Sequence, residues 1–427
     1  MPQRFARILL VALATFCVAL PAWSREIAPG SDLRAAVKTL KPGDELVLDG
    51  GTYAIDFRFI VTANGTAGKL IVIRAKAGKH PVIAQSNRDE EIIEIRDSQY
   101  VVIRGIEFRG GSHGINLVES DFITIEDCEI HDTGDAAIAA NAGGTYEGLK
   151  LLRNDIHHTA GSGEGMYLGC NRDECRLANS LIEGNHVHHT NGPDVEQGDG
   201  IEVKEGSYGN VIRDNVVHDT NAPGIITYGT VGNGPANIIE RNAIWNVKDN
   251  GIQSAADAVI RNNIVLGSPI ALQKHQGASP SNLQVVHNTV ITKGDAIALR
   301  DVSGEVLIAN NALYSSGGFA VHLVSGTASW VTSAGNVGVG GLSRMASGLA
   351  KARGLRDDFV EASSDLRPKA GSSLISAGSR NFVGADDFDG VARGGVADAG
   401  AYRYSRALKP KWIVGPTFKL KLEVARP

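Results

Sequence analysis

A carboxylate, an amine and a phenol that could act as acid or base lie in two nearby segments of the chain. Glu202 and Lys204 lie two residues apart in the segment IEVK, and Tyr228 follows in GIITYGT. A lysine is an efficient base at neutral pH when its pKa falls well below about 10.4, and a nearby carboxylate raises that pKa. This spacing therefore favours a charged Lys204 that binds an anionic group. A surface ion pair of little energetic value and an exposed tyrosine are the alternatives.

A repeat of short apolar strands must position these residues. Each strand is followed by the pattern Asn-x-Ile or Asn-x-Val, as in LLRNDI, LIEGNHV and VIRDNVV. The asparagines that we align are Asn154, Asn185, Asn215, Asn242, Asn262, Asn288 and Asn311. The number of residues between successive asparagines varies but does not fall below a common minimum. This indicates coils of fixed circumference, some of which carry added loops. We expect the aligned asparagines to form a structural ladder of stacked amides.

A second repeating strand lies between the asparagines. Its first apolar column is Ile115, Ile138, Met166, Ile201, Ile225, Ile252, Ile270 and Ile297. Its second is Leu117, Ala140, Leu168, Val203, Thr227, Ser254, Leu272 and Leu299. The period of two points both columns inward and the intervening residues outward. Because the spacing leaves no room for helices between strands, we predict an all-β fold, a single-stranded right-handed parallel β-helix with an N-terminal helical cap.

The outward columns gather polar side chains on one surface. Adjacent coils of a parallel β-helix lie about 4.8 Å apart, so the catalytic candidates Lys204, Tyr228 and Glu202 should be neighbours. The candidate substrate-binding residues on the same surface are Tyr167, Gln253, Gln273, His275 and Arg300. Loops 160–165, 169–176 and 191–198 should form a wall beside them. A solvent-facing stripe of acid, base, phenol and amide is typical of a sugar-binding groove.

Three segments carry a resemblance to a known family. LRAAVKTLKPGDELVLDGGTY with GKLIVIRA, and IEVKEGSYGNVIRDN, resemble the alginate lyase and chondroitinase B family of polysaccharide lyases, within the pectate lyase-like superfamily. DFDGVARGGVADAGAYRY resembles a terminal motif of bacterial β-helix proteins. The resemblance implies that Lys204 is the base and that calcium ligands occupy positions 197 and 199. Here those residues are Gln197 and Asp199, and Tyr228 stands where the family's arginine would fall.

Several functions are compatible with this surface. β-Elimination from an acidic, uronate-containing polysaccharide needs a base, an acid for the departing oxygen and a neutralising charge; Lys204, Tyr228 and Asp199 with calcium would supply them. A glycoside hydrolase would instead pair Asp199 and Glu202 with Glu164 or Asp194. An epimerase or a non-catalytic glycan-binding β-helix would also fit such a surface.

Histidines and cysteines supply further candidate sites. His131, His157, His188 and His218 form another aligned column, which we interpret as a structural ladder in preference to a metal site. Cys170 and Cys175 are close enough in one loop to form a disulfide in an oxidising compartment. Cys128 falls at a core-facing position and is expected to be a buried free thiol.

The N-terminus indicates export. Arg4 and Arg7 precede the apolar run 8–20, and small residues suit cleavage after Ser24. We therefore predict a signal peptide over 1–24, N-terminal cap and first coils over 25–100, β-helix repeats over 101–326, and C-terminal coils and a tail over 327–427. The expected location is periplasmic or secreted, with no membrane span after cleavage. A net charge of −5 does not favour a nucleic-acid partner, and we expect a monomer that binds polysaccharide.

Overall fold

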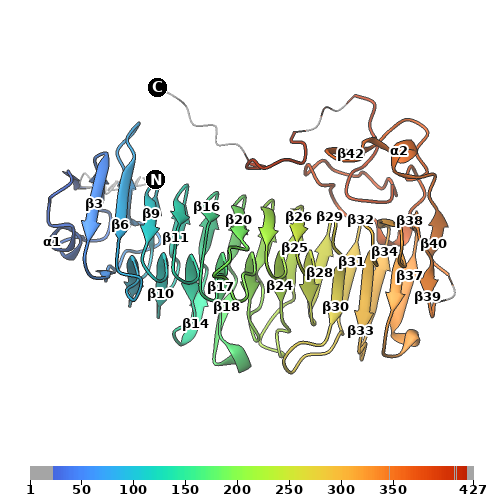
Figure 1. Cartoon of the computed structure of the whole chain (residues 1–427), viewed down its shortest axis with the longest axis horizontal. Helices are drawn as coiled ribbons and strands as arrows, with labels where there is room; N and C mark the ends of the chain where they lie inside the picture. The colour runs from blue at the N-terminus through green and yellow to red at the C-terminus, as the bar shows by residue number, and fades with distance from the viewer. Residues whose placement is uncertain (1–22, 346, 408, 410, 421–427) are drawn as a thin grey trace, which may run out of the picture.

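Three long parallel sheets wind the chain into a right-handed β-helix, as the sequence predicts (Figure 1). The computed structural model describes residues 23–345, 347–407, 409 and 411–420. Sheet 1 contains β1 (Ser24–Ile27), β2 (Glu45–Leu48), β5 (Ile71–Ala75), β8 (Val101–Arg104), β11 (Thr124–Glu126), β15 (Lys150–Leu152), β19 (Leu181–Glu183), β22 (Val211–Arg213), β25 (Asn237–Glu240), β28 (Ala258–Arg261), β31 (Leu283–Val286), β34 (Val306–Ala309) and β37 (Val331–Ala334).

The other two long sheets complete each coil. Sheet 2 contains β3 (Gly51–Ile55), β6 (Pro81–Gln85), β9 (Glu107–Gly110), β12 (Glu129–His131), β16 (Asp155–His157), β20 (His186–Thr190), β23 (Val216–Thr220), β26 (Ala243–Val247), β29 (Ile264–Leu266), β32 (Thr289–Thr292), β35 (Ala312–Ser315), β38 (Asn336–Val339) and β40 (Leu349–Lys351). Sheet 3 contains β4 (Phe59–Val61), β7 (Ile93–Arg96), β10 (Ile115–Val118), β13 (Ile138–Ala140), β17 (Met166–Leu168), β21 (Ile201–Val203), β24 (Ile225–Thr227), β27 (Ile252–Ser254), β30 (Ile270–Gln273), β33 (Ile297–Arg300), β36 (Val321–Leu323) and β39 (Leu342–Ser343).

Short elements lie outside the three sheets. They are α1 (Leu33–Lys38), α2 (Leu355–Asp358), the β14–β18 pair (Gly144–Glu147 and Cys175–Ala178), the β41–β42 pair (Phe359–Glu361 and Asp365–Pro368), and the 3-10 turns Asn171–Asp173, Ala328–Trp330 and Arg380–Phe382. Helix α1 begins at the N-cap Asp32, whose carboxylate accepts a hydrogen bond from the Ala35 backbone. It buries Leu33 and Val37 at the left-hand end of the solenoid in Figure 1.

The core of each coil follows the predicted inward columns of sheet 3. The first column is in register from Ile115 through Ile297, and its side chains are fully buried. The second column is buried as well. The hydroxyl groups of Thr227 and Ser254 in this column form a hydrogen bond of 3.0 Å with each other. Burial of a continuous apolar stack across every coil is the main force that holds the solenoid together.

The asparagine ladder is confirmed, with one correction. Each amide donates to the next amide oxygen along the stack and to a backbone carbonyl; Asn215, for example, bonds Asn242 at 2.9 Å and Ile182 at 3.0 Å. The assignment of Asn262 was wrong, because Asn263 occupies that rung. Two adjacent asparagines both fit the pattern Asn-x-apolar. Asn262 instead has a positive φ of 55° and turns its side chain away from the ladder.

A C-terminal segment folds back over the outer face of sheet 2. Its Phe388, Tyr402 and Trp412 pack on apolar residues of β23, β26, β29, β35 and β38. In Figure 1 this segment lies along one side of the right half of the solenoid. Lys419 donates to Asp214 and to the carbonyls of Arg241 and Phe388. The segment therefore fastens to coils far earlier in the sequence.

Two sequence expectations concern the chain ends. Most of the expected signal peptide, residues 1–22, lies outside the described residues. In the part of the chain that is described, no helix combines the length and apolar character that crossing a membrane requires.

Candidate active site

Lys204, Glu202 and Tyr228 meet on the outer side of sheet 3. Lys204 Nζ lies 2.5 Å from Glu202 Oε1 and 3.4 Å from Tyr228 OH. The Tyr228 hydroxyl donates to the same carboxylate oxygen at 2.8 Å. Strand register explains the contact, because Glu202 and Ile226 are paired and Lys204 and Tyr228 follow two positions later. One carboxylate thus holds both an ammonium and a phenol.

The three side chains are buried, whereas a solvent-facing stripe was expected. Lys204 is 4%, Glu202 2% and Tyr228 3% exposed. The Lys204 ammonium lies between two aromatic rings, 4.3 Å from the centroid of Tyr167 and 5.2 Å from that of Tyr228. The ring of His275 packs edge-on against Tyr228 at 4.6 Å. These aromatic contacts and the covering loops shield Lys204, Glu202 and Tyr228 from water, which strengthens the electrostatic interactions among them.

The protonation of this group follows from burial and charge. Burial lowers the pKa of Lys204, but the Glu202 carboxylate outweighs that effect and the net pKa is raised. Burial, reinforced by the same carboxylate, raises the pKa of Tyr228. Lys204 is therefore an ammonium and Tyr228 a neutral phenol at neutral pH. The sequence predicts that the nearby carboxylate raises the pKa of Lys204, and the direction of this shift is confirmed.

Glu164, Asp199 and Glu202 form a buried acidic cluster. One carboxylate oxygen from each lies within 4.8 Å of the others. Glu164 and Asp199 come from equivalent corners of adjacent coils, because each precedes a glycine and a paired strand residue, Met166 or Ile201. Burial, and then the carboxylates of Glu202 and Glu164, raise the pKa of Asp199 to about 8. Burial also raises the pKa of Glu164.

The cluster has oxygen atoms that no protein group satisfies. Glu164 Oε1 and Glu202 Oε2 are buried and lack a hydrogen-bond partner among the described residues, although Ser162 donates to the other oxygen of Glu164 at 2.6 Å. Buried charged oxygens without partners are costly unless a ligand satisfies them. Calcium prefers carboxylate oxygens, so this donor set fits it. Asp199 was the predicted ligand, and Glu164 and Glu202 would complete the set.

Amides continue the polar surface toward the C-terminal coils. Gln253 Oε1 accepts from Gln273 at 2.9 Å and from Asn250 at 2.8 Å, and Arg300 donates to Gln273 at 3.2 Å. The structure thus brings the predicted Gln253, Gln273 and Arg300 into one chain of contacts. Asn250 was missed; it occupies the same corner position as Glu164 and Asp199, and this alignment could have found it.

A cavity of about 520 Å³ opens over these residues. Its lining combines Asp199, Glu202, Tyr228, Gln253, Gln273 and His275 with Glu196, Gln197, Asn221, Ala222, Pro223, Ile226 and Asp249. Two of the expected wall loops are joined by a backbone bridge between Gly161 and Val195. Asp194, an alternative carboxylate, is exposed on this wall and is not part of the acidic cluster.

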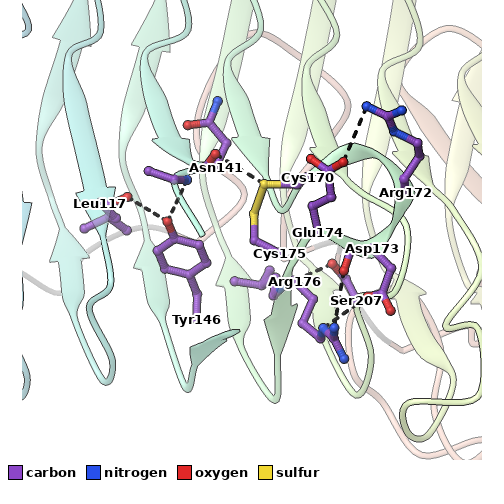
Figure 2. Close-up of a disulfide and its surroundings, with 12 residues drawn as sticks. Leu117, Asn141, Tyr146, Cys170, Arg172, Asp173, Glu174, Cys175, Arg176 and Ser207 are labelled. Carbon is purple, nitrogen blue, oxygen red and sulfur yellow. Dashed lines mark hydrogen bonds and ion pairs between the residues drawn. A yellow bond between two sulfur atoms is a disulfide. The ribbon is translucent and has the colours of Figure 1, made fainter. Parts of the chain in front are cut away.

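The third wall loop contains the predicted disulfide. Cys170 and Cys175 are bonded, and Figure 2 shows Arg172 and Glu174 paired in the turn that the bond closes, at 3.4 Å. Asn171 in this turn accepts a hydrogen bond from Gln276 at 3.3 Å. Two loops therefore meet beside Lys204. Cys128 is buried and free, as expected.

Two family models match the chain. The model of the Pel9A-like right-handed β-helix region matches residues 25–221, and a general right-handed β-helix model matches residues 178–336. The first span contains Glu164, Asp199, Glu202 and Lys204. No curated protein sequence matches the chain.

Solved structures with the same fold are distant in sequence. Pectate lyase Pel9A is 16% identical, with a TM-score of 0.51 over 90% of this chain and 98% of that one. XylC, solved with xylose, is 11% identical, with a TM-score of 0.58 over 92% and 99%. An alginate lyase from Paenibacillus sp. str. FPU-7 is 22% identical, with a TM-score of 0.46 over 77% and 97%. These comparisons show a β-helix whose structural neighbours are largely polysaccharide lyases.

Proposed function

We propose that this protein is an exported polysaccharide lyase that cleaves an acidic, uronate-containing polysaccharide by β-elimination. The contact of Lys204 with Tyr228 and Glu202, both of which line the cavity, carries the proposal. The reaction needs a group that removes the proton beside the uronate carboxylate and a group that protonates the departing oxygen. An amine and a phenol held by one carboxylate provide both.

Lys204, in its neutral form, is assigned as the base, and Tyr228 as the acid. Glu202 accepts hydrogen bonds from both Nζ and the phenol hydroxyl and so fixes their relative positions. The Tyr228 hydroxyl is a neutral donor, as the raised pKa requires. The raised pKa of Lys204 means that the reactive form is a minority at neutral pH.

An acidic lining would repel a uronate unless a cation is present. Asp199, Glu202 and Asp249 all line the cavity. Glu164, Asp199 and Glu202 would hold calcium, which when bound would supply the charge that neutralises the sugar carboxylate. Burial of the three carboxylates beside one another supports this assignment, since it is their mutual repulsion that a cation removes.

A second candidate is a glycoside hydrolase acting on a neutral sugar. The observation that favours it is the pKa of Asp199, raised to about 8, beside Glu202. A carboxyl group that stays protonated at neutral pH, next to an ionised one, is the pattern of a general acid and its partner. The acidic lining also suits a substrate without charge.

The discriminating experiment follows two products at once. Metal-depleted protein is incubated with alginate, pectate and neutral polysaccharides, with and without added calcium, while ultraviolet absorbance and new reducing ends are recorded. A calcium-dependent rise in both on a uronate polymer supports the lyase. New reducing ends without the unsaturated chromophore would identify the hydrolase.

Variants then test the assigned roles. Lys204→Ala and Tyr228→Phe should each reduce kcat by about 10²–10⁴-fold, the usual contribution of a positioned acid or base. Lys150→Ala is the matched control, because Lys150 is an exposed lysine on a strand of sheet 1. Full turnover by Lys204→Ala with normal folding would exclude Lys204 as the base.

A further inference from the structure

The outer face of sheet 1 is not used by the proposed reaction. The candidate active site lies on sheet 3, and sheet 2 carries the C-terminal segment and the predicted ladder of histidines. In that ladder the rings of His131, His157, His188 and His218 are stacked, with successive centroids 4.8, 4.9 and 5.2 Å apart. On sheet 1, a cavity of about 440 Å³ opens over β31, β34 and β37 (Figure 1). Its volume lies in the range of about 300–1,000 Å³ that is usual for ligand sites.

One row of side chains from three adjacent coils forms the floor of this cavity. Gln284, Leu307 and Thr332 are in register on β31, β34 and β37, and all three line the cavity. They face outward, because the residues on either side of Leu307, Val306 and Ile308, are buried in the core. An amide, an apolar side chain and a hydroxyl therefore lie in succession along the solenoid axis.

A second row lies at the start of the same strands. Asn282, Glu305 and Trp330 each precede the first residue of β31, β34 and β37, so this row repeats at the coil spacing of about 4.8 Å. The indole of Trp330 is 45% exposed. Among the residues that the structure describes, none forms a hydrogen bond or an ion pair with the side chain of Gln284, Glu305 or Trp330. These groups are therefore available to a ligand.

A turn of the C-terminal segment supplies a second aromatic ring. Phe382, in the 3-10 turn Arg380–Phe382, lines the same cavity and is half-buried. The buried side chain of Asn310, just after β34, donates to the carbonyls of Ser379 and Phe382, both at 3.0 Å. The turn is thus fixed to the solenoid. Two aromatic side chains are held in place before any ligand arrives, which reduces the entropic cost of binding.

We propose that this cavity is a non-catalytic site that binds neutral pyranose units of a polysaccharide. A pyranose has C–H groups on its ring faces and hydroxyls around its edge. Trp330 offers a large, rigid surface for a ring face, and the amides of Asn282 and Gln284 can both donate to and accept from hydroxyls. Among the described residues that line the cavity, Glu305 is the one charged side chain, and it would repel a uronate carboxylate. The site would hold the protein on a neutral glycan, whatever reaction occurs on sheet 3.

The test measures binding by titration calorimetry with cellohexaose, mannohexaose and xylohexaose, and with oligogalacturonate and oligomannuronate as charged counterparts. Wild-type protein and Lys204→Ala should bind at least one neutral hexasaccharide equally well, because Lys204 lies beside the cavity of sheet 3. Adding Trp330→Ala to Lys204→Ala should weaken this binding by at least tenfold. The exposed indole makes no hydrogen bond that the fold could lose, and circular dichroism would check that the fold is kept.

A matched control and three outcomes decide the proposal. Phe57→Ala removes another exposed aromatic ring, 50% accessible, near helix α1, and should leave binding unchanged. Failure to bind any neutral hexasaccharide, or equal binding with and without Trp330, would overturn the proposal. Tighter binding of the charged oligomers through Trp330 would overturn it too. A dimer that dissociates in Trp330→Ala during sedimentation would assign this surface to a second copy of the chain and would also overturn it.

Discussion

Removal of one rung of the asparagine ladder should destabilise the solenoid far more than its small size suggests. The substitution Asn215→Ala removes an amide that makes four hydrogen bonds in the buried interior. Its Oδ1 accepts from the backbone and side-chain amides of Asn185, both at 2.9 Å. Its Nδ2 donates to the Ile182 carbonyl and to the Asn242 amide oxygen.

The magnitude follows from the group left without a partner. The Asn185 backbone N–H loses the partner that Asn215 supplies, and Asn185 is fully buried. The Ile182 carbonyl keeps the strand-ladder hydrogen bond of the β19–β22 pair. An unsatisfied buried polar group costs roughly 1–3 kcal/mol, so we expect a loss of roughly that size. Asn185 Nδ2 and Asn242 Oδ1 keep other bonds, to Leu151 and to the Asn215 backbone, and add little.

The measurement compares urea denaturation of the variant with that of Asn221→Ala. Asn221 lies on the same coil, but its side chain donates only to the Gln197 carbonyl and accepts from Lys248 near the surface, so its loss should cost about 1 kcal/mol or less. Because repeats can unfold locally, amide hydrogen exchange at β19 and β22 should accompany the denaturation. Equal destabilisation by the two variants, or unchanged exchange at β19, would refute the reasoning.

Three further predictions concern the pH dependence of stability, the disulfide and the free thiol. Burial lowers the pKa of His287 from 6.5 to about 3. The contribution of His287 to the free energy of unfolding is therefore complete above pH 6.5, and it falls by roughly 1.4 kcal/mol per pH unit as the pH drops toward 3. His287→Gln should make the free energy of unfolding depend less steeply on pH between pH 6.5 and 4. An unchanged slope would contradict this prediction. Replacing Cys170 and Cys175 by serine should cost about 2 kcal/mol, given the short loop. Cys128, whose pKa burial raises to about 12, should react with thiol reagents only after unfolding, as spectrophotometric titration would show.

The repeat and its inward columns could be predicted because they depend on a period of two that recurs in every coil. Ile201 and Ile225 are 24 residues apart in sequence, yet their pairing was visible from the pattern alone. One rung was misassigned where Asn262 and Asn263 are adjacent. Only the backbone conformation distinguishes them, since Asn262 adopts a positive φ.

The residues that form the candidate site could be predicted from the sequence, but their burial could not. Coil spacing brought Lys204 and Tyr228 together correctly. Their burial could not be predicted, because it depends on loops such as 274–278 whose fold has no periodic signal. The convergence of Glu164 with Asp199 is encoded in a repeated acid-glycine corner, which is recognisable once the register is known.

The return of the C-terminal segment restricts how this solenoid can change in length during evolution. Lys419 must reach Asp214, while Arg393 must reach Asn262. A coil duplicated between Asp214 and the last strands would lengthen that span by about 4.8 Å and strain these attachments. A coil added before Asp214 would leave them intact. Natural homologues should therefore gain and lose whole coils in the N-terminal half, whereas the number of coils beneath the C-terminal segment should stay constant.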